Sequence, residues 1–510
     1  MYRLSLTVAL LAAVTAAVIG LRWGTYAAGG SDSSCYALMA DAFAAGTLQP
    51  TSHLAGQVPW PDAAKTFTPG GFVASESNPS ASAPVCAPGF SVLLAPLIVI
   101  GGADAMFILT PIAGGLLVWL TFVAGSAVGG PLAGAMASLL IAASPAMLYQ
   151  VVQPMNDVTT AALWMATFTA LIRRRWALAG LCCGVALLVR PNLLPLAMVA
   201  GIYVAAASGP GIRGISRFAI AAAPFGILVL WLNNGLYGSP FRTGYGQLGH
   251  LFGFSSVPVN AANYLGWLVE THTPFPLLAV AAPFAVAREK RGGAVLALGL
   301  IAATCVVYLF YTPFDDWSYL RFLLPAIALM TVMASVVVVQ VMGRVLPGRS
   351  ATSTLAAALA TGAIALFCVR VAADRLAFNL KSLEQRYRSA GIVVRDRLPQ
   401  GAVVLSVWDS GAVRFHGRKE ALTWAGLDPA WLDRSVSWLD ARGHPPYILV
   451  ESWEEPEFRN RFGGRSDIGK LDWPPKYEVD RVVRIFDPRD RAKYDRGESV
   501  TTEYLWPSRD

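Results

Sequence analysis

Apolar segments of about the length that crosses a lipid bilayer recur through residues 1–372. A crossing helix needs about 20 apolar residues, with a range of about 17–25. Of the 510 residues, 55% are hydrophobic and 14% are charged, whereas soluble domains average about 25% charged residues. The sequence therefore predicts a polytopic α-helical membrane protein, and it excludes a soluble enzyme, a disordered chain and a secreted disulfide scaffold. The predicted spans, about 11 in number, are 4–21, 104–124, 131–150, 158–172, 177–189, 192–207, 218–234, 274–287, 294–312, 322–342 and 353–372.

The charges divide the chain into two parts. Residues 1–372 hold 17 Lys and Arg with 10 Asp and Glu, whereas residues 373–510 hold 23 and 22. We expect a transmembrane module over 1–372, with a long outer loop at 22–103, and an extracytoplasmic domain over 373–510.

The composition of the C-terminal part is that of an ordinary soluble domain. Strands are predicted at 402–407, 447–450 and 482–486, and they alternate with predicted helices. This alternation is typical of a small α/β domain.

The loops between the spans differ in their charge. One alternate set holds 11 basic residues and 1 acid, while the other side, span interiors included, holds 6 basic and 9 acidic residues. Basic loops stay in the cytoplasm, so the N-terminus is predicted to be cytoplasmic, and an odd number of spans places the C-terminal domain outside a plasma (inner) membrane. The net charge of +8 is then explained by the basic cytoplasmic loops that set the orientation in the membrane. No nucleic-acid partner is expected.

Two cysteines, Cys35 and Cys86, fall in the predicted outer loop. An oxidising compartment permits a disulfide there, and two free thiols are the alternative.

Two acids lie close to the predicted outer face. Asp32 follows the first span by about ten residues and precedes a helix expected to begin near Ser33, and Asp157 enters the fourth span. A helix N-cap is the alternative explanation of each. Two carboxylates at this level are also able to share an acceptor hydroxyl or a divalent cation. A metal is left open.

Arg190 interrupts an apolar stretch at Leu188-Val189-Arg190-Pro191-Asn192. The two arms beside it are short, so the arginine lies at or below the outer interface. A cation at that depth is a functional hypothesis, and a lipid phosphate is its natural partner. Snorkelling to the headgroups is the alternative.

Further polar candidates lie in two other outer segments. Asp315, Asp316 and Arg321 accompany several aromatic residues after span 294–312, and they are candidates to hold a phosphate or a metal. Arg242 is a further candidate for the phosphate, and Tyr245 for a substrate contact. Tyr245 lies in a G-x-G-x-x-G pattern, but no strand precedes it, which excludes a dinucleotide site.

The order and sidedness of these features resemble the GT-C superfamily of integral-membrane glycosyltransferases, in the branch of protein O-mannosyltransferases and aminoarabinose transferases. The resemblance covers about residues 1–372. The segments that carry it are Gly30-Ser31-Asp32-Ser33 with Tyr36, Ala87-Pro88-Gly89-Phe90, Gln153-Pro154-Met155-Asn156-Asp157, Arg190-Pro191-Asn192 and Trp317-Ser318-Tyr319-Leu320-Arg321-Phe322.

The resemblance implies transfer of a sugar, hexosyl or pentosyl, from a polyprenyl-phosphate carrier to a glycan, glycolipid or protein acceptor outside the membrane. It implies inversion, with Asp32 as general base and Arg190, Arg321 or Arg242 at the donor phosphate. Many relatives carry a second acid directly after this Asp. Ser33 stands there in this chain, and Asp157 is the residue that would compensate.

Two other functions remain alternatives to the glycosyltransferase. A secondary transporter or lipid flippase usually shows paired halves with interrupted helices, and the Arg190-Pro191 break has no counterpart in the other half. A catalytically inactive membrane scaffold is the third hypothesis, and Ser33 favours it.

Overall fold

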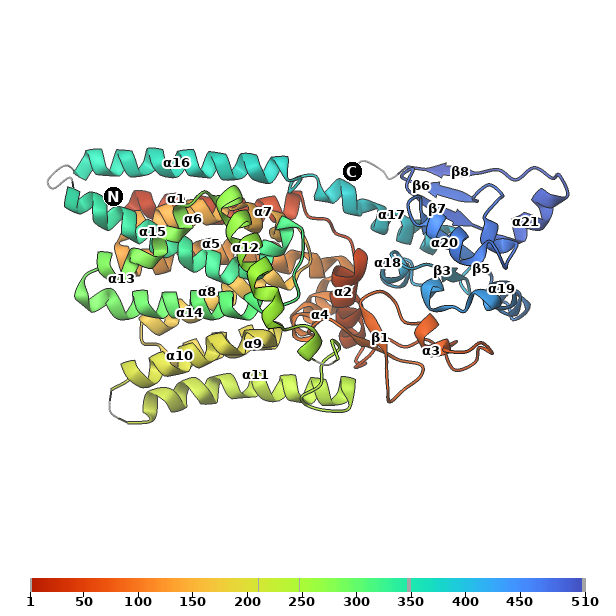
Figure 1. The fold of residues 1–510 in the computed structure, drawn as a ribbon, viewed down its shortest axis with the longest axis horizontal. Coiled ribbons are helices and arrows are strands. Elements are labelled where there is room, and N and C mark those ends of the chain that lie inside the picture. The colour runs from red at the N-terminus through yellow and green to blue at the C-terminus, as the bar shows by residue number, and fades with distance from the viewer. Residues whose placement is uncertain (1, 210, 247, 346–349, 507–510) are drawn as a thin grey trace. The chain divides into compact units, whose positions relative to one another are not determined.

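The computed structural model describes residues 2–209, 211–246, 248–345 and 350–506 (Figure 1). They form two compact units. The helical unit comprises Met1–Gly24, Phe107–Trp231 and Gln247–Lys381, and the sheet unit comprises Thr25–Met106, Leu232–Gly246 and Ser382–Asp510.

Each of the predicted spans is helical. The described α-helices of the helical unit are α1 (Tyr2–Arg22), α5 (Leu109–Gly129), α6 (Pro131–Ala142), α7 (Pro145–Val151), α8 (Asn156–Ile172), α9 (Trp176–Val189), α10 (Leu194–Ala207), α11 (Arg213–Tyr237), α12 (Val257–His272), α13 (Ala282–Ala285), α14 (Arg291–Leu309), α15 (Leu324–Val345) and α16 (Ser350–Asp374). Short 3₁₀ turns precede several of them, including η2 (Pro191–Leu193), η5 (Phe275–Ala281) and η7 (Trp317–Leu323). Where α12 lies, the sequence predicts a loop, and the structure has a helix instead.

The chain is a polytopic membrane protein. Among the described residues, six helices are long and apolar enough to cross a membrane, and the number is seven if α6 and α7, bent by 58° at their break, form one span. The remaining predicted spans are shorter helices of 17 residues or fewer, namely α8, α9, α10 with η2, and η5 with α13. Length alone therefore supports fewer crossings than the 11 apolar segments predicted.

Helices of the helical unit pack closely where small residues meet. A side chain at Gly125 of α5 would collide with the backbone of Gly134 in α6, 2.8 Å away. Small residues allow two helix backbones to approach within van der Waals contact, which is the usual source of stability for helices in lipid.

The sheet unit is built on a six-stranded mixed sheet with the order β4-β3-β5-β7-β6-β8 (Figure 1). Strand β3 pairs parallel with β4 and β5, and β7 pairs antiparallel with β5 and β6. The strands are β3 (Val403–Leu405), β4 (Glu420–Leu422), β5 (Pro446–Glu451), β6 (Tyr477–Val479), β7 (Val483–Phe486) and β8 (Glu503–Leu505). The helices of this part are α17 (Leu380–Arg397), α18 (Ser410–Phe415), α19 (Leu432–Ala441), α20 (Glu455–Phe462) and α21 (Pro488–Asp495).

Both faces of this sheet are buried. Along β5, Ile448 and Val450 join a core with α19 and α20, whereas Tyr447 and Leu449 join a second core with α17. Alternate strand residues point to opposite faces, and helices cover both, so β5 is buried along its full length. This is the α/β domain that the sequence predicts for the C-terminal part.

The segment after α1 folds with this sheet. It contains α2 (Gly30–Ala44), α3 (Ala63–Thr66), a hairpin of β1 (Phe72–Ala74) and β2 (Ser82–Pro84), and α4 (Gly89–Gly101). Its side chains Leu54, Trp60 and Phe67 lie in the same core as Leu405 and Ile448 of the sheet. Residues 25–106 and 382–510 therefore share one hydrophobic core.

Three strands, β4, β6 and β8, are absent from the sequence prediction. Each has only three residues, which is too short for an alternating pattern of polar and apolar residues to be read. They are positioned by pairing, β4 with β3, β6 with β7 and β8 with β6, and their own sequences do not reveal these partners.

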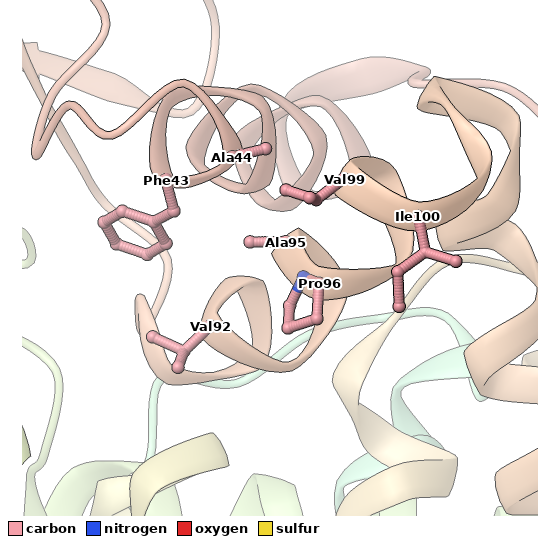
Figure 2. Close-up of a pocket in the computed structure, with 7 residues that line it drawn as sticks. All are labelled: Phe43, Ala44, Val92, Ala95, Pro96, Val99 and Ile100. Carbon is pink, nitrogen blue, oxygen red and sulfur yellow. The ribbon is translucent and has the colours of Figure 1, made fainter.

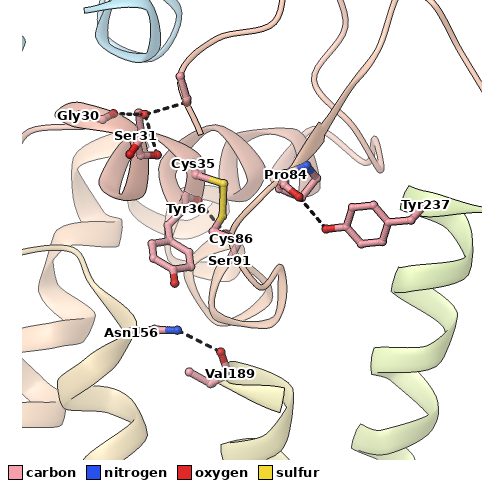
Figure 3. The surroundings of a disulfide bond; sticks show 12 residues. Gly30, Ser31, Cys35, Tyr36, Pro84, Cys86, Ser91, Asn156, Val189 and Tyr237 are labelled. Carbon is pink, nitrogen blue, oxygen red and sulfur yellow. Dashed lines mark hydrogen bonds between the residues drawn. A yellow bond between two sulfur atoms is a disulfide. The ribbon is translucent and has the colours of Figure 1, made fainter. Parts of the chain in front are cut away.

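Cys35 and Cys86 form a disulfide that links α2 to the chain before α4 (Figure 3). The bond closes a loop over a sequence separation of 51 residues. The structure thus has the paired arrangement, which is one of the two alternatives left open by the sequence.

We expect Cys35→Ser with Cys86→Ser to destabilise the sheet unit by about 2–4 kcal/mol, because the open chain gains conformational entropy when it unfolds. Limited proteolysis of the 47–88 segment in lipid nanodiscs measures this as faster cleavage. Cys182→Ser, a half-buried free cysteine of the helical unit, is the control. Equal cleavage rates in both variants would contradict the expectation.

Candidate active site

Asp32 lies in the first turn of α2 and is exposed to solvent. The helix begins at Gly30 rather than near Ser33, and the N-cap position belongs to Gly29, without a side-chain capping bond. The N-cap explanation of Asp32 is therefore wrong. An acid in the first turn interacts favourably with the helix dipole, and its carboxylate remains accessible.

Contacts on two sides hold this end of α2 in place. On one side, Gly411 of α18 packs so closely on Ser34 that an added Cβ would lie 2.2 Å from the serine side chain. On the other side, α4 is joined to α2 by the disulfide and by the Ser91 hydroxyl, which donates to the Tyr36 carbonyl at 2.9 Å (Figure 3). The first turn of α2 is therefore presented on a fixed support.

Asp157 and Arg190 form a buried ion pair in the helical unit. Arg190 Nη2 donates to Asp157 Oδ1 at 2.6 Å and to Asn156 Oδ1 at 2.7 Å, while Asn156 Nδ2 donates to the Val189 carbonyl at 3.2 Å. Figure 3 shows this last bond. The two charged side chains are 10% and 0% exposed. Asp157 is the second residue of α8, and its neighbour Met155 occupies the N-cap position, so Asp157 is also not a cap.

Two arginines meet at one aromatic ring. The guanidinium of Arg190 lies 5.6 Å from the ring centre of Phe322, and that of Arg321 lies 5.2 Å from it. Tyr308 stacks on the same ring at 4.9 Å, and its hydroxyl accepts from Asn192 Nδ2 at 3.2 Å. Cation–π contacts keep guanidinium groups beside an apolar surface.

The structure thus brings together three of the predicted site residues, Asp157, Arg190 and Arg321. Two guanidinium groups share this cluster with one carboxylate, so its formal charge is positive. Asp157 Oδ2 is buried with no hydrogen-bond partner among the described residues. A low-dielectric setting strengthens the attraction of such a cluster for an anion.

The other predicted site residues lie elsewhere. Arg242 forms an exposed ion pair with Glu76 at 2.7 Å in the sheet unit, and Tyr245 of the same segment is 46% exposed. Asp315 and Asp316 are exposed on the helical unit, and Asp316 Oδ1 caps η7 by accepting from Ser318 N at 2.8 Å.

The donor set does not fit a bound metal. Within the described part of the chain, no group of three or more His, Cys, Asp or Glu side chains is arranged to hold one. Asp157 is engaged with a guanidinium, which opposes a cation at the same carboxylate.

Solved structures with a similar fold identify the architecture. No protein-family model matches this sequence, and no curated protein matches it. ArnT from Cupriavidus metallidurans bound to undecaprenyl phosphate is similar with a TM-score of 0.58 and 14% identity, covering 89% of this chain and 94% of ArnT. The apo state of the same ArnT is similar with a TM-score of 0.57 and 15% identity, and the match covers 93% of this chain and 97% of ArnT.

An oligosaccharyltransferase from Archaeoglobus fulgidus, tethered to an acceptor peptide, is similar with a TM-score of 0.54 and 13% identity over 89% of this chain and 70% of that one. The chain therefore shares the fold of these membrane proteins, which is the GT-C-like fold expected from the sequence. The structural similarity covers about nine-tenths of this chain, so it extends into the sheet unit.

An apolar cavity of about 400 Å³ opens between α2 and α4 (Figure 2). Its lining includes Phe43, Val92 and Pro96, and α4 ends with the strongly exposed Val99 and Ile100. At 13 residues, α4 is about 20 Å long, which is shorter than the hydrocarbon core of a bilayer. These properties suit a helix that contacts lipid at the membrane interface.

An acidic cluster in the sheet unit is absent from the sequence prediction. Asp409 is fully buried, and neither of its carboxylate oxygens has a hydrogen-bond partner among the described residues. Burial raises the pKa of Asp409 well above its usual range, and Glu451 and Glu454 raise it further by repulsion, while Arg386 opposes them. Arg386 Nε in turn donates to both carboxylate oxygens of Glu451 at 3.0 Å.

This acidic cluster lies beside the start of α2. A side chain at Gly29 would collide with the Tyr387 ring and the Glu384 carboxylate of α17. Glu384 itself has a pKa raised by burial. Nothing in the local sequence signals the cluster, because α17, β5 and α18 contribute its members from separate parts of the chain.

Breaking the Asp157–Arg190 pair should destabilise the helical unit. Arg190→Ala leaves a buried carboxylate without its counter-charge, which costs about 3–5 kcal/mol. The double variant Asp157→Asn/Arg190→Gln should recover part of the loss. Thermal unfolding in nanodiscs checks this, with Arg173→Ala, an exposed arginine after α8, as control. A single variant as stable as the control would contradict the expectation.

The sheet unit should lose stability as the pH rises. Burial raises the pKa of Glu454 from 4.5 to about 7, so between these values the folded chain keeps a proton that the unfolded chain has lost. The free energy of unfolding then falls by about 3 kcal/mol from pH 4.5 to pH 7, and Asp409 acts in the same direction.

Hydrogen exchange of the β5 amides across this pH range measures the effect. Glu454→Gln should reduce the slope, whereas Glu457→Gln, an exposed glutamate of the same helix, should leave it unchanged. A wild-type profile that is flat after correction for intrinsic exchange would rule out a titrating Glu454.

Proposed function

We propose that this protein is a membrane glycosyltransferase. It moves a hexosyl or pentosyl group from a polyprenyl-phosphate-linked donor to an acceptor hydroxyl on the outer face of the membrane, with inversion at the sugar carbon. The observation that carries the proposal is the meeting of Arg190 and Arg321 at Phe322 within a GT-C fold.

The fold supports this class of donor. ArnT, which is similar over 89% of this chain, was solved bound to undecaprenyl phosphate. A lipid-linked donor needs apolar surface for its tail, and α4 with its cavity supplies such a surface. Its phosphate needs a cation that is not fully hydrated, and a guanidinium held in an apolar setting meets that need.

Arg190, which is buried, and Arg321, which is half-buried, suit the leaving group. As the bond between C1 of the sugar and the phosphate oxygen breaks, negative charge grows on the polyprenyl phosphate. Arg190 and Arg321 stabilise that charge, and prepositioned cations of this kind usually make a large contribution to catalysis. Asp157 positions Arg190, because it holds the guanidinium at 2.6 Å. Arg242 remains a second candidate for the phosphate, although Glu76 already neutralises it.

Asp32 acts as the general base. Its carboxylate accepts the proton of the acceptor hydroxyl while the hydroxyl oxygen forms a bond to C1, and polyprenyl phosphate leaves from the opposite side. A base must come within about 3 Å of the proton it removes. The exposed position of Asp32 on the first turn of α2 allows a large acceptor to approach. Tyr245, Asp315 and Asp316 remain candidates for substrate contacts.

The outer location also belongs to this proposal. The N-terminus is cytoplasmic because the basic loops favour that side, and the sheet unit is extracytoplasmic. The disulfide between Cys35 and Cys86 supports this orientation, because such bonds persist in oxidising compartments.

Three strains test the function: one with the gene deleted, one complemented with the wild-type chain and one complemented with Asp32→Asn. Glycans, glycolipids and glycoproteins of the envelope are profiled by mass spectrometry, and protein levels are checked by blot. We expect one sugar to be missing in both the deletion and the Asp32→Asn strain, because loss of a general base slows transfer by about 10²–10⁴-fold.

Asp396→Asn is the control, since Asp396 is an exposed acid of α17 in the same unit and lies in neither proposed site. If Asp32→Asn restores the wild-type profile, Asp32 is not the base. If the deletion itself leaves every glycan unchanged, a transporter, a lipid flippase or an inactive scaffold replaces the glycosyltransferase.

A further inference from the structure

A second cavity, of about 460 Å³, lies wholly within the sheet unit. Its walls are the C-terminal half of α2, the loop 47–54, the start of β3 and the turn from α18 into β4. The size falls within the range of small-molecule sites. The segment Arg414-Phe415-His416-Gly417-Arg418 contributes its two arginines, the first and last residues, to the lining of the cavity.

Protein groups hold both arginines in place. Arg414 Nη2 donates to the Thr51 carbonyl at 2.5 Å, and Arg418 Nη1 donates to Asp41 Oδ2 at 2.6 Å. Arg418 also adopts a left-handed backbone conformation with φ of 50°, which costs energy for a residue with a side chain. The turn thus keeps its arginine side chain at the cavity despite this strain.

Two charged groups of the cavity lack hydrogen-bond partners among the described residues, although the charge of Glu420 interacts with that of Arg414. Lys419 is half-buried, and its ammonium makes no hydrogen bond or ion pair with any described residue. Glu420 Oε2 is buried and has no hydrogen-bond partner in the described part of the chain. A buried polar atom without a partner costs about 1–3 kcal/mol, so a ligand that supplies hydrogen bonds at this position gains that energy.

The mixture of charges selects the chemistry of the ligand. A bare phosphate offers acceptors to Lys419 but would be repelled by Glu420 and Asp41. A metal ion would be repelled by Arg414, Arg418 and Lys419. A sugar hydroxyl both donates and accepts hydrogen bonds, so a sugar is able to donate to Glu420 and accept from Lys419.

The position fits an extended acceptor. Asp41, which lines the cavity, is nine residues after Asp32 on α2, and this corresponds to about 14 Å along the helix axis. Residues 33–40 of α2 are buried between these two positions, so an acceptor of several sugars bound in the cavity would cross the elements that cover them to reach Asp32.

We propose that this cavity binds a sugar residue of the acceptor, so that the acceptor is a glycan or a glycolipid rather than a bare protein. The inference rests on the proposed glycosyltransferase function and names its acceptor class. Lys419 and Glu420 are the residues that select the sugar.

Binding to the full-length chain in lipid nanodiscs tests the proposal. The probes are methyl glycosides of mannose, glucose, galactose and arabinose, with inorganic phosphate for comparison, and the readout is saturation-transfer NMR with titration. We expect a glycoside to bind, and Lys419→Ala and Glu420→Gln each to weaken it about tenfold. The matched controls Lys470→Ala and Glu457→Gln, both at exposed positions of the sheet unit, should bind as the wild type does.

Several results would overturn the proposal. They are no glycoside binding to the wild-type chain, equal binding by all variants, and binding of phosphate alone that Lys419→Ala removes. Hydrogen exchange of the β3 and β4 amides, if it matches the wild type, excludes misfolding as the cause of lost binding.

The strain experiment separates this proposal from the function itself. Lys419→Ala and Glu420→Gln strains that keep a normal glycan profile, while Asp32→Asn loses its sugar, overturn the acceptor site and leave the glycosyltransferase standing. Sugar binding that depends on Lys419 and Glu420 in a chain whose deletion changes no glycan overturns the acceptor role.

Discussion

A lipid bilayer offers no hydrogen-bond partner to the backbone, and this constraint shapes the whole chain. Each peptide group inside the hydrocarbon must be paired within its own segment, which leaves the helix as the available structure for a chain of this composition. The described residues of the helical unit accordingly form helices and short 3₁₀ turns joined by loops. Every strand of three or more residues in the described part of the chain lies in the sheet unit.

The same constraint explains where charge is placed. A charged group among apolar helices is costly unless it is paired, and Arg190 meets this requirement with Asp157 and Asn156 while its guanidinium also faces Phe322. The pair fixes the break between α9 and α10 against the start of α8. The same contact ties these helices together and positions the guanidinium that we propose for the phosphate, so the stability of the unit and the proposed chemistry both depend on it.

The sheet unit differs from the helical unit in that it holds an exposed acid, Asp32, on a rigid support. Asp32 lies on a helix, α2, whose N-terminal part packs on α18 and on α4. Gly29, the residue before this helix, lies against α17. A disulfide and a shared hydrophobic core join this helix to a sheet that begins more than 350 residues later in the chain. Rigid support of this kind is what a general base or a binding residue requires.

Much of the fold could be predicted from local sequence. Every apolar segment that the sequence marks is helical, and the strands β3, β5 and β7 lie where their apolar runs predict them. The predicted helix start near Ser33 is wrong by three residues, because Gly30 with φ of 57° enters the helix in a conformation that the sequence pattern does not reveal. The sequence marks Asp157, Arg190 and Arg321 separately, and it does not indicate that Asp157 pairs with Arg190 or that the two arginines meet at Phe322.

The sequence by itself determined which segments are apolar enough for lipid, which part is soluble, and which polar residues stand out against an apolar background. These properties follow from composition and periodicity, which act over a few helical turns. Only the tertiary structure decided that Asp157 pairs with Arg190, that Cys35 bonds to Cys86, and that Lys419 and Glu420 face one cavity. Such pairings depend on where distant segments meet, and that is set by the packing of the whole chain, since no local pattern records the distance between two side chains far apart in the sequence.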